Sequence, residues 1–461
     1  MRFFGHYISR SIFILGFIEI SVLVVSIYTA QFLRWADLDQ FWPWIVDNAP
    51  KAVTFTAIFW LTMVSLGVYH RDVAHDRWMS VVRLLVSFAI GFVLLSMVIY
   101  VVPDLNIWRS FVAIAVPLSL GLIVLIRMVF LRVTGIDTFK RKILILGTGM
   151  LASRIVELEQ EDPSSDFVCV GFVRVNDSEP KVDPSKIFAN LNSLVDFAKS
   201  AGIDEIVVAL EERRGGFPME QLLACKSSNI RITEYTNFWE RETGQVDLDT
   251  LRPSWIVFSE GFVGGPLQAV IKRLFDVTAS LLLLVFSLPI LVLTALAVRF
   301  TSRGPVLYRQ ERVGRDGNKF MLLKFRSMEV DAEADGTPRW AGQRDPRVTS
   351  VGRFIRKSRI DEIPQIFNVL RGDMSFIGPR PERPFFVDTL AQQVPYYRER
   401  HQVKPGISGW AQLNYPYGAS VDDAKMKLRY DLYYIKNYSV FLDLIVMMQT
   451  VRVVLWPDGA R

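Results

Sequence analysis

The sequence predicts a membrane protein of mixed architecture: a four-helix transmembrane bundle, an α/β Rossmann-like middle domain, and a mostly helical (α+β) C-terminal domain with a re-entrant membrane helix. Hydrophobic residues make up 51% of the 461 residues, which is high for a soluble protein. Four apolar runs open the chain, a fifth lies far from them, and a strand–glycine turn–helix pattern lies between. We expect the three parts at residues 1–135, 140–250 and 268–461, the last with its re-entrant helix at 272–300.

The four N-terminal runs lie at about residues 10–33, 52–69, 82–102 and 108–131. Each is close to the ~20 residues that cross ~30 Å of hydrocarbon. The first loop, Ala36–Pro50, carries three aspartates and neither lysine nor arginine. The second loop carries Arg71, Arg77 and Arg83, and the exit of the fourth run carries Arg127, Arg132, Lys140, Arg141 and Lys142. This asymmetry predicts that both ends of the bundle lie in the cytoplasm.

One acidic residue, Glu19, lies inside a predicted span. Ionisable residues at this depth usually face the interior of a bundle, and some mark a transport path. We expect a structural role for Glu19 facing the bundle, with a transport role as the alternative.

The fifth apolar run, Leu274–Phe300, differs from the other four. Ser287 and Pro289 lie near its middle, where a proline removes a backbone hydrogen bond and kinks a helix. Basic residues flank both of its ends, whereas a spanning helix should show charge asymmetry. We therefore predict a re-entrant helix that is broken at Ser287–Pro289 and returns to the same face. The alternative, a kinked fifth span, would place everything after residue 300 outside the cell.

The middle domain reads as α/β. A short apolar strand at Lys142–Leu146 leads into Gly147-Thr-Gly149-Met-Leu-Ala152 and a helical pattern through Glu159. Further strands are predicted at Phe167–Val173 and Glu205–Leu210. This is the context of a dinucleotide-binding fingerprint.

Two features argue against cofactor chemistry in this domain. The third glycine of the fingerprint is Ala152, and the second strand ends at Val173–Arg174 instead of at an acid that could bind a ribose. The chain also lacks the Tyr-x-x-x-Lys pair of sugar-nucleotide dehydratases and epimerases. We predict a non-catalytic module that binds a nucleotide or forms an oligomer contact, its glycines serving the tight turn.

Residues 304–415 combine basic residues with small turn residues. The pattern includes Lys324-Phe-Arg326-Ser-Met328, Arg344-Asp345-Pro346-Arg347-Val-Thr349, Gly352-Arg353-Phe-Ile-Arg356, Asp361-Glu362-Ile-Pro364-Gln365 and Gly372–Pro381. An arginine fork binds phosphate bidentately, and a carboxylate can act as nucleophile or metal ligand. Mg²⁺ prefers one or two carboxylates plus substrate phosphates. Arginine guanidinium groups around the adjacent carboxylates Asp361 and Glu362 therefore suggest phosphoryl transfer. The alternative is that this Asp-Glu-x-Pro is the ordinary N-terminus of a helix, as an isolated motif of this kind would be.

These motifs resemble the bacterial sugar transferase family, the polyprenyl-phosphate hexose-1-phosphate transferases that start exopolysaccharide and O-antigen repeat units. The resemblance covers about residues 268–458 and rests on Lys324–Met328, Asp361–Gln365, Asn368, Gly372–Pro381 and Arg400-His401-x-Val-x-Pro405-Gly406. The whole layout resembles the long members of the family. The segment Arg252–Phe262 resembles the linker of a subgroup associated with exosortase-linked exopolysaccharide clusters.

The resemblance implies a two-step displacement. Asp361 would attack the β-phosphate of a UDP-sugar and release UMP, and undecaprenyl phosphate would then take the phosphosugar. A covalent step divides one reaction between a soluble and a lipid substrate into two simpler ones. Glu362 would bind Mg²⁺, together with Asp361, or help to deprotonate the lipid phosphate; both roles stay open.

The resemblance also assigns phosphate-binding residues. Arg356 and Arg380 match positions that hold phosphate, and Lys324 and Arg326 are expected to face the pyrophosphate or the lipid phosphate. Two further candidates are Gln365, as a site residue, and His401, as either a structural or a site residue.

The reaction implies a UDP-sugar (glucose first, galactose second), undecaprenyl phosphate and membrane lipids as partners. A homodimer is a further expectation, and no nucleic-acid partner is expected. Because UDP-sugars are cytosolic, we expect a multi-pass protein of the bacterial inner membrane with a cytosolic C-terminal domain. The apolar segment 440–456, interrupted by Asp443, Gln449 and Arg452, is expected to be an interfacial helix. The alternatives are a membrane-anchored sugar-nucleotide-modifying enzyme and a non-catalytic polysaccharide-assembly scaffold.

Overall fold

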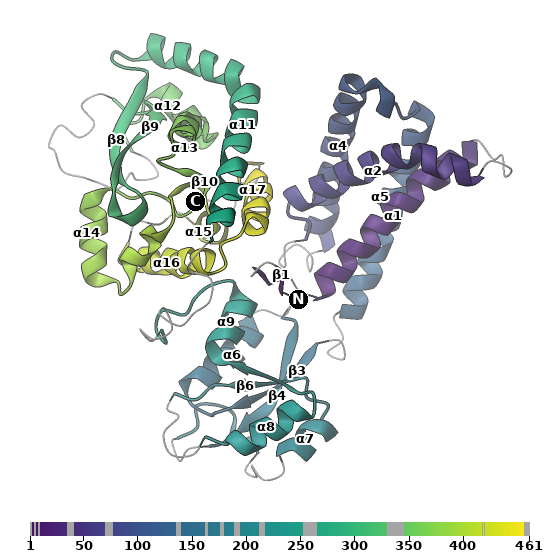
Figure 1. The fold of residues 1–461 in the computed structure, drawn as a ribbon, viewed down its shortest axis with the longest axis vertical. Helices are drawn as coiled ribbons and strands as arrows, with labels where there is room; N and C mark the ends of the chain where they lie inside the picture. The colour runs from purple at the N-terminus through teal and green to yellow at the C-terminus, as the bar shows by residue number, and fades with distance from the viewer. Residues whose placement is uncertain are drawn as a thin grey trace. The chain divides into compact units, whose positions relative to one another are not determined.

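The computed structural model describes residues 2–3, 6–7, 10–34, 41–69, 77–134, 140–161, 165–175, 179–188, 194–211, 217–251, 265–329, 345–416, 418 and 420–455. The chain divides into two compact units, one formed by residues 7–243 and the other by residues 244–461 together with 2–6. Figure 1 labels their elements. The segment Arg252–Phe262, which suggested a family subgroup, lies outside the described residues.

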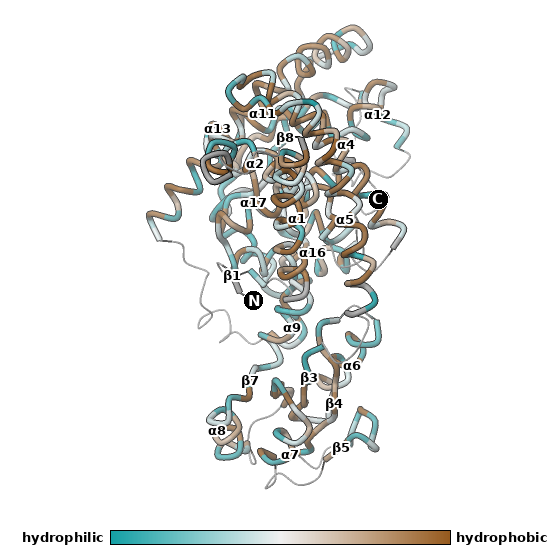
Figure 2. The backbone as a smooth tube through the Cα atoms, turned by 90° about the vertical axis from the view of Figure 1, so that its right-hand side faces the viewer, coloured by the Kyte–Doolittle hydropathy of each residue, from teal (hydrophilic) through white to brown (hydrophobic). Residues whose placement is uncertain are grey.

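Helices form at all four N-terminal apolar runs. They are α1 (Arg10–Arg34), α2 (Phe41–Ser65), α4 (Arg77–Val101) and α5 (Arg109–Thr134), with a short 3-10 turn η2 (Pro103–Leu105) before α5. α1 packs against α5 and α2, and α2 packs against α4. Figure 2 shows the apolar character along these helices, and many of their large apolar side chains are exposed, as lipid-facing residues would be.

Four of the described helices are long and apolar enough to cross a membrane: Ile12–Leu33, Trp78–Val101, Arg109–Phe130 and Pro266–Thr301. Three of them are predicted spans, and the fourth is the segment predicted to be re-entrant. The predicted second span, now α2, is not among them. Its first half carries Asp47, Pro50 and Lys51, and the apolar part that follows ends with the helix at Ser65.

Glu19 faces the interior of the bundle, as predicted. Its two carboxylate oxygens accept from Nε and Nη2 of Arg127 at 2.6 and 3.0 Å, and both side chains are buried. Arg127 also donates to the Val68 carbonyl and the Ser80 hydroxyl. Counting Arg127 among the basic residues of a cytoplasmic loop was therefore wrong, because Arg127 lies inside α5. Its partner Glu19 is far away in the sequence, so the count of charges near the ends of the spans could not reveal the pair.

The middle domain is a five-stranded parallel sheet in the order β5-β4-β3-β6-β7. Its strands are β3 (Arg141–Leu146), β4 (Phe167–Val173), β5 (Ile187–Phe188), β6 (Glu205–Val208) and β7 (Arg231–Glu234), and its helices are α6 (Met150–Glu161), η4 (Pro184–Lys186), α7 (Leu194–Ser200), α8 (Met219–Ser227) and α9 (Tyr235–Thr243). The first strand lies in the middle, as in doubly wound folds. The Rossmann-like prediction is confirmed.

Residues along β3 alternate between two hydrophobic cores. Ile143 and Ile145 pack with α6 and α9, whereas Leu144 and Leu146 pack with α7 and α8. Figure 1 shows the two pairs of helices on opposite faces of the sheet. The continuous apolar run of this strand thus reflects burial on both faces.

The glycine turn after β3 is closed by a carboxylate of the domain itself. Gly147 has φ of +128°, and a Cβ there would collide with the Ala209 carbonyl, so only glycine suits this position. The backbone N–H of Met150, at the start of α6, donates to Oε1 of Glu211 at 2.7 Å. An anion of the protein thus lies where a dinucleotide-binding domain would place a phosphate.

The middle domain ends earlier than the predicted residue 250. Val246 and Leu248 belong to the core of the second unit, and the Val246 N–H donates to the Arg429 carbonyl at 3.0 Å. Trp410 Nε1 donates to the Gly244 carbonyl at 2.8 Å. We call residues 244–251 the strap, because this short segment packs on the second unit. Apolar and acidic residues alternate from Val246 to Asp249, a pattern that could have predicted the strap from the sequence but was not used.

The second unit is mostly helical, as predicted. Its sheets are the hairpin β8 (Leu307–Val313) and β9 (Lys319–Phe325), turned at η6 (Arg315–Gly317), and the parallel pair β10 (Ser375–Ile377) and β11 (Gly406–Ser408); its helices are α11 (Pro266–Thr301), α12 (Ser350–Lys357), η7 (Ile360–Gln365), α13 (Ile366–Arg371), α14 (Pro384–Gln393), η8 (Tyr397–Gln402), α15 (Trp410–Asn414), α16 (Val421–Lys436) and α17 (Val440–Leu455). The short N-terminal strands β1 (Arg2–Phe3) and β2 (His6–Tyr7) pair with each other, and His6 Nδ1 lies 3.0 Å from the Tyr433 hydroxyl.

The predicted break at Ser287–Pro289 is wrong as stated: α11 is one helix of 36 residues that runs through Pro289. Figure 1 shows that it bends sharply, and the proline supplies the physical cause of a kink. Both ends pack on the same unit. Arg273 donates to the Val369 and Leu370 carbonyls near one end, and Val298 packs with Phe325 near the other. A helix that returns to its own face needs this arrangement.

Asp443, one of the polar residues that interrupt the apolar segment 440–456, lies in α17 and does not face water. The interfacial position of this helix stays a prediction. Asp443 is fully buried, 3.0 Å from the Lys272 ammonium, and accepts from the Tyr434 hydroxyl at 2.7 Å. Lys272 also pairs with Asp276 at 2.9 Å. This buried cluster joins α17 to the start of α11, a contact between segments too far apart for the sequence to predict.

Candidate active site

Asp361 and Glu362 lie in η7, directly after a sharp turn. The turn is made at Arg359, which adopts a left-handed conformation with φ of +58°. Both carboxylates are largely buried, with 7% and 8% of their surfaces exposed. The pair therefore lies inside the unit, where charges interact more strongly than in water.

Asn368 of the predicted motif fixes η7 and α13 against β9. Its Oδ1 accepts from the Leu323 N–H at 3.0 Å, and its Nδ2 donates to the Met321 carbonyl at 2.8 Å. The side chain thus bonds to the backbone of β9 as a neighbouring strand would. This bonding brings Lys324, the next residue of β9, against the carboxylate pair.

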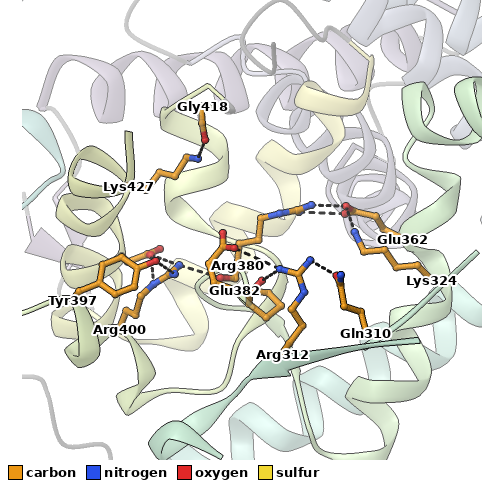
Figure 3. A network of polar contacts seen from close by, with 12 residues as sticks. Gln310, Arg312, Lys324, Glu362, Arg380, Glu382, Tyr397, Arg400, Gly418 and Lys427 are labelled. Atoms are coloured by element: carbon orange, nitrogen blue, oxygen red, sulfur yellow. Dashed lines mark hydrogen bonds and ion pairs between the residues drawn. The ribbon is translucent and has the colours of Figure 1, made fainter. Parts of the chain in front are cut away.

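Three cations surround Glu362, two of them visible in Figure 3. Lys324 Nζ lies 3.0 Å from Oε1, Arg380 Nη2 lies 2.7 Å from the same oxygen, and Arg359 Nη1 lies 3.9 Å away. Burial disfavours the charged form of Glu362, but Arg380 and Lys324 outweigh it and hold the pKa of this carboxyl well below its usual range. Arg359 was not among the predicted site residues.

Asp361 is in a different electrostatic state. Burial, and then the neighbouring charge of Glu362, raise the pKa of the Asp361 carboxyl to about 6, against the opposing effects of Lys324, Arg380 and Arg356. Within the described residues no ion pair or side-chain hydrogen bond engages it. Two adjacent carboxylates thus have separate characters: one paired and ionised, the other unpaired and more basic.

The structure brings five predicted residues together: Asp361, Glu362, Lys324, Arg380 and, through its charge, Arg356. Gln365 is buried on the same 3-10 helix.

Two other predicted residues bond to groups outside this cluster. Arg326 donates from Nη2 to the backbone carbonyl and hydroxyl of Ser302 at 2.8 and 2.7 Å and so binds the end of α11. His401 bonds the Arg398 carbonyl at 3.2 Å, and burial together with Arg400 lowers the pKa of its ring to about 4. This environment matches the structural role that we considered for His401.

A cavity of about 520 Å³ in the second unit reaches the cluster. Glu362, Arg359 and Arg380 contribute charged walls, whereas Leu283 of α11 and Met447 and Val451 of α17 contribute apolar walls. Its size lies within the range of small-ligand sites. A ligand with a charged group and an apolar chain matches this lining.

Among the described residues no group of three or more His, Cys, Asp or Glu side chains could hold a metal ion. Mg²⁺ does not need one, because it can be bound by one or two carboxylates together with substrate phosphates. Asp361 and Glu362 are adjacent oxygen donors of this kind, provided that Lys324 and Arg380 turn from Glu362 toward the substrate.

Comparison with known proteins gives the family. A family model for "Bacterial sugar transferase" matches residues 267–457, and one for "CoA-binding domain" matches residues 64–219. The UDP-glucose:undecaprenyl-phosphate glucose-1-phosphate transferase of Escherichia coli (strain K12) is 33% identical over 358 residues, which cover 76% of this chain and 75% of that protein. The chain belongs to the bacterial sugar transferase family. The predicted resemblance is confirmed.

Two more relatives show how the sugar transferase family varies. The UDP-N-acetylgalactosamine-undecaprenyl-phosphate N-acetylgalactosaminephosphotransferase of Aeromonas hydrophila is 41% identical over 259 residues, which cover 56% of this chain and 60% of that relative. A UDP-glucose:undecaprenyl-phosphate glucose-1-phosphate transferase of Caulobacter vibrioides is 36% identical over 274 residues, which cover 53% of this chain and 98% of that relative. Relatives of similar identity thus carry names with different sugars.

Proposed function

We propose that this sugar transferase moves a sugar-1-phosphate from a UDP-sugar to undecaprenyl phosphate and releases UMP, as the first membrane step of exopolysaccharide biosynthesis. The observation that carries the proposal is the unpaired, buried carboxylate of Asp361 beside a Glu362 that is neutralised by Lys324 and Arg380. An electron-rich oxygen among cations is the environment that phosphoryl transfer requires.

In the first proposed step, an Asp361 carboxylate oxygen attacks the β-phosphorus of the UDP-sugar. A bond forms between that oxygen and phosphorus, and the bond from phosphorus to the bridging oxygen breaks, so that UMP leaves. Lys324, Arg359 and Arg380 are placed to balance the charge on the phosphate oxygens. The sugar–oxygen bond is never broken, and the anomeric configuration is therefore retained.

In the second step, an oxygen of the lipid phosphate attacks the same phosphorus. The bond to Asp361 breaks, and the carboxylate is regenerated. The cavity offers a place for this acceptor, because its charged walls adjoin apolar walls from α11 and α17. We assign the phosphate to the charged end and the first isoprene units to the apolar end.

Mg²⁺ is part of the proposal. It would be held by Asp361 and Glu362 with oxygens of the substrate diphosphate, and it would neutralise charge that develops on the leaving group. Asp361 and Glu362 would also orient the diphosphate. Because both carboxylates are largely buried, few water molecules can reach them.

We also propose that α11 re-enters the inner membrane and leaves the second unit on the cytosolic side, where UDP-sugars are available. The contacts of both ends of α11 with one unit support this. A single cysteine at position 303 (Arg303→Cys) should be labelled by an impermeant reagent from the cytosolic side only. Labelling from the periplasmic side would refute the re-entrant topology.

The donor sugar that we propose is glucose, as the Escherichia coli and Caulobacter relatives' names indicate. The name of the Aeromonas relative makes UDP-N-acetylgalactosamine the second candidate. The test is a screen of UDP-glucose, UDP-galactose and UDP-N-acetylgalactosamine for UMP release with undecaprenyl phosphate and Mg²⁺. Release with UDP-glucose alone supports the assignment; release with another sugar alone corrects it, and no release with any refutes the transferase.

A further inference from the structure

The loop Gly378–Glu382, which carries Arg380, is held almost entirely by groups outside it. Four consecutive carbonyls accept hydrogen bonds: that of Pro379 from the Gly406 N–H (2.9 Å), that of Arg380 from Arg400 Nη2 (3.0 Å), that of Pro381 from Arg312 Nη1 (3.0 Å) and that of Glu382 from the Val313 N–H (3.0 Å). The two prolines restrict the backbone and cannot donate. The position of the loop is therefore set by its partners, and two of those partners are arginine side chains.

Arg380 connects this loop to the site. Its guanidinium group is 2.7 and 3.5 Å from the two oxygens of Glu362, while its own carbonyl is the acceptor of Arg400. Figure 3 shows Arg400 and Glu362 on opposite sides of Arg380. A shift of the backbone at Arg380 would displace its guanidinium group from Glu362 and from any phosphate bound there.

Arg400 is itself held by two side chains in addition to the Arg380 carbonyl. Its Nε and Nη2 lie 3.1 and 2.8 Å from one oxygen of Asp431, and its Nη1 donates to the Tyr397 hydroxyl at 2.9 Å. Arg400 and Asp431 are 6% and 2% exposed. A buried ion pair adds little net stability relative to well-packed apolar residues, because desolvation opposes the attraction. A role of the Arg400–Asp431 pair other than stabilising the fold is therefore expected.

We propose that Arg400, clamped by Asp431 and Tyr397, is a positioning residue that holds Arg380 against Glu362 by binding the Arg380 carbonyl. A planar guanidinium group can bind three partners in three directions at once, whereas a lysine ammonium on a flexible stem cannot hold the same fork. The proposal rests on the proposed function for its kinetic readout, because its effect on chemistry passes through Arg380.

A double-mutant cycle separates this role from simple stabilisation of the fold. Arg400→Lys should lower kcat/KM for UMP release about 10- to 100-fold, the cost of a misplaced binding group. Arg380→Lys should lower it by more, since it removes the fork itself. If Arg400 acts through Arg380, the double variant should be within about threefold of Arg380→Lys alone, because residues in one network are not additive. Losses that multiply in the double variant would overturn the proposal.

Two further variants guard against misfolding and surface effects. Tyr397→Phe removes one neutral hydrogen bond from the clamp without a charge change, and a loss of about two- to fivefold that disappears in an Arg380→Lys background would support the same conclusion. Arg398→Lys is the matched control, because Arg398 is an exposed arginine of the same 3-10 helix, 3.5 Å from Asp388. Its activity should equal that of the unchanged protein.

Hydrogen exchange supplies a readout that does not depend on activity. In Arg400→Lys, the amides of Gly406 and Val313, which bind the neighbouring carbonyls of the loop, should exchange faster, whereas amides of β3 should not change. Unchanged exchange at Gly406 and Val313 would contradict the positioning role. A parent protein that releases no UMP from any UDP-sugar would refute the transferase, and the exchange result would then decide this proposal alone.

Discussion

Two regions of this sugar transferase place a carboxylate where phosphate chemistry is expected, with opposite outcomes. In the middle domain, Glu211 accepts from the Met150 N–H and occupies the helix end that could bind a phosphate. In the second unit, Asp361 is buried beside Glu362, and the nearby cations pair with Glu362. Glu211 thus accepts a hydrogen bond within its own domain, whereas Asp361 has no ion-pair or side-chain hydrogen-bond partner among the described residues. The difference favours the second unit as the place of phosphate chemistry, and the non-catalytic role of the sheet stays a prediction.

The largest expected effect is at Asp361. Asp361→Asn keeps the shape of the side chain but removes its nucleophilic charge, and UMP release should fall by a factor on the order of 10⁴ or more. Asp388→Asn, an exposed aspartate on α14, is the matched control and should retain full activity. Appreciable turnover by Asp361→Asn, with no trace of deamidation back to aspartate by mass spectrometry, would rule out Asp361 as nucleophile.

Two deletions of the middle domain, one that ends before the strap and one that removes most of it, should differ in UMP release. A chain lacking residues 141–243, closed by a flexible linker, should retain measurable UMP release, because the strap (residues 244–251) still covers the second unit. A chain lacking 141–250 loses the buried side chains of Val246 and Leu248, each contributing roughly 1.5–3 kcal/mol. It should show at least about tenfold less activity and a lower melting temperature. Equal activity of the two deletions would show that the strap is dispensable; complete loss in a well-folded 141–243 deletion would contradict the non-catalytic role.

The pH dependence should report Asp361. Because the pKa of Asp361 is raised to about 6 in the free protein, its attacking form is lost as the pH falls through that value. The rate of UMP release in a single turnover at UDP-sugar concentrations well below KM, which reports the free enzyme, should therefore rise with pH and level off above about 7. At pH 5 the rate should be about one tenth of the plateau. A rate limited by an unshifted carboxyl would stay near its plateau at pH 5, and that result would contradict the environment described for Asp361.

The smallest effect on catalysis is expected at Glu211. Glu211→Gln should change UMP release less than about twofold, since this residue lies outside the proposed active site. It removes a charge that favours the start of α6, at a cost of roughly 0.3–1 kcal/mol, and it opens the helix end to an anion. The melting temperature of the variant should therefore rise with inorganic phosphate more than that of the unchanged protein. A large loss of UMP release in Glu211→Gln would show that the middle domain is coupled to catalysis and would contradict its predicted non-catalytic role.

Local patterns predicted much of the fold and of the candidate site. The strand and helix periods placed β3, β4, β6 and α6, and the motifs placed Asp361, Glu362, Lys324 and Arg380 in one site. These features depend on neighbours in the sequence or on a dense motif.

Features that depend on distant partners were missed. Arg127 was read as a loop charge because Glu19 is its partner only in the folded bundle. Asp443 was noted only as an interruption of an apolar segment, because its partner Lys272 is far away in the sequence. Asp431 was not predicted to contribute to the site, because its role depends on its ion pair with Arg400, which only the folded structure shows. Arg359 is two residues from Asp361, but no sequence pattern indicated the left-handed backbone there or the 3.9 Å approach of its side chain to Glu362.

The central claim is that Asp361 carries the phosphosugar, and trapping that intermediate tests it most directly. The purified full-length protein is mixed with UDP-glucose and Mg²⁺ without lipid acceptor, quenched rapidly, and digested for mass spectrometry. The account predicts one equivalent of UMP per active site and a hexose-phosphate mass on the peptide that contains Asp361, lost when undecaprenyl phosphate is added. UMP release that depends entirely on the lipid acceptor, or an adduct on another residue, would contradict it.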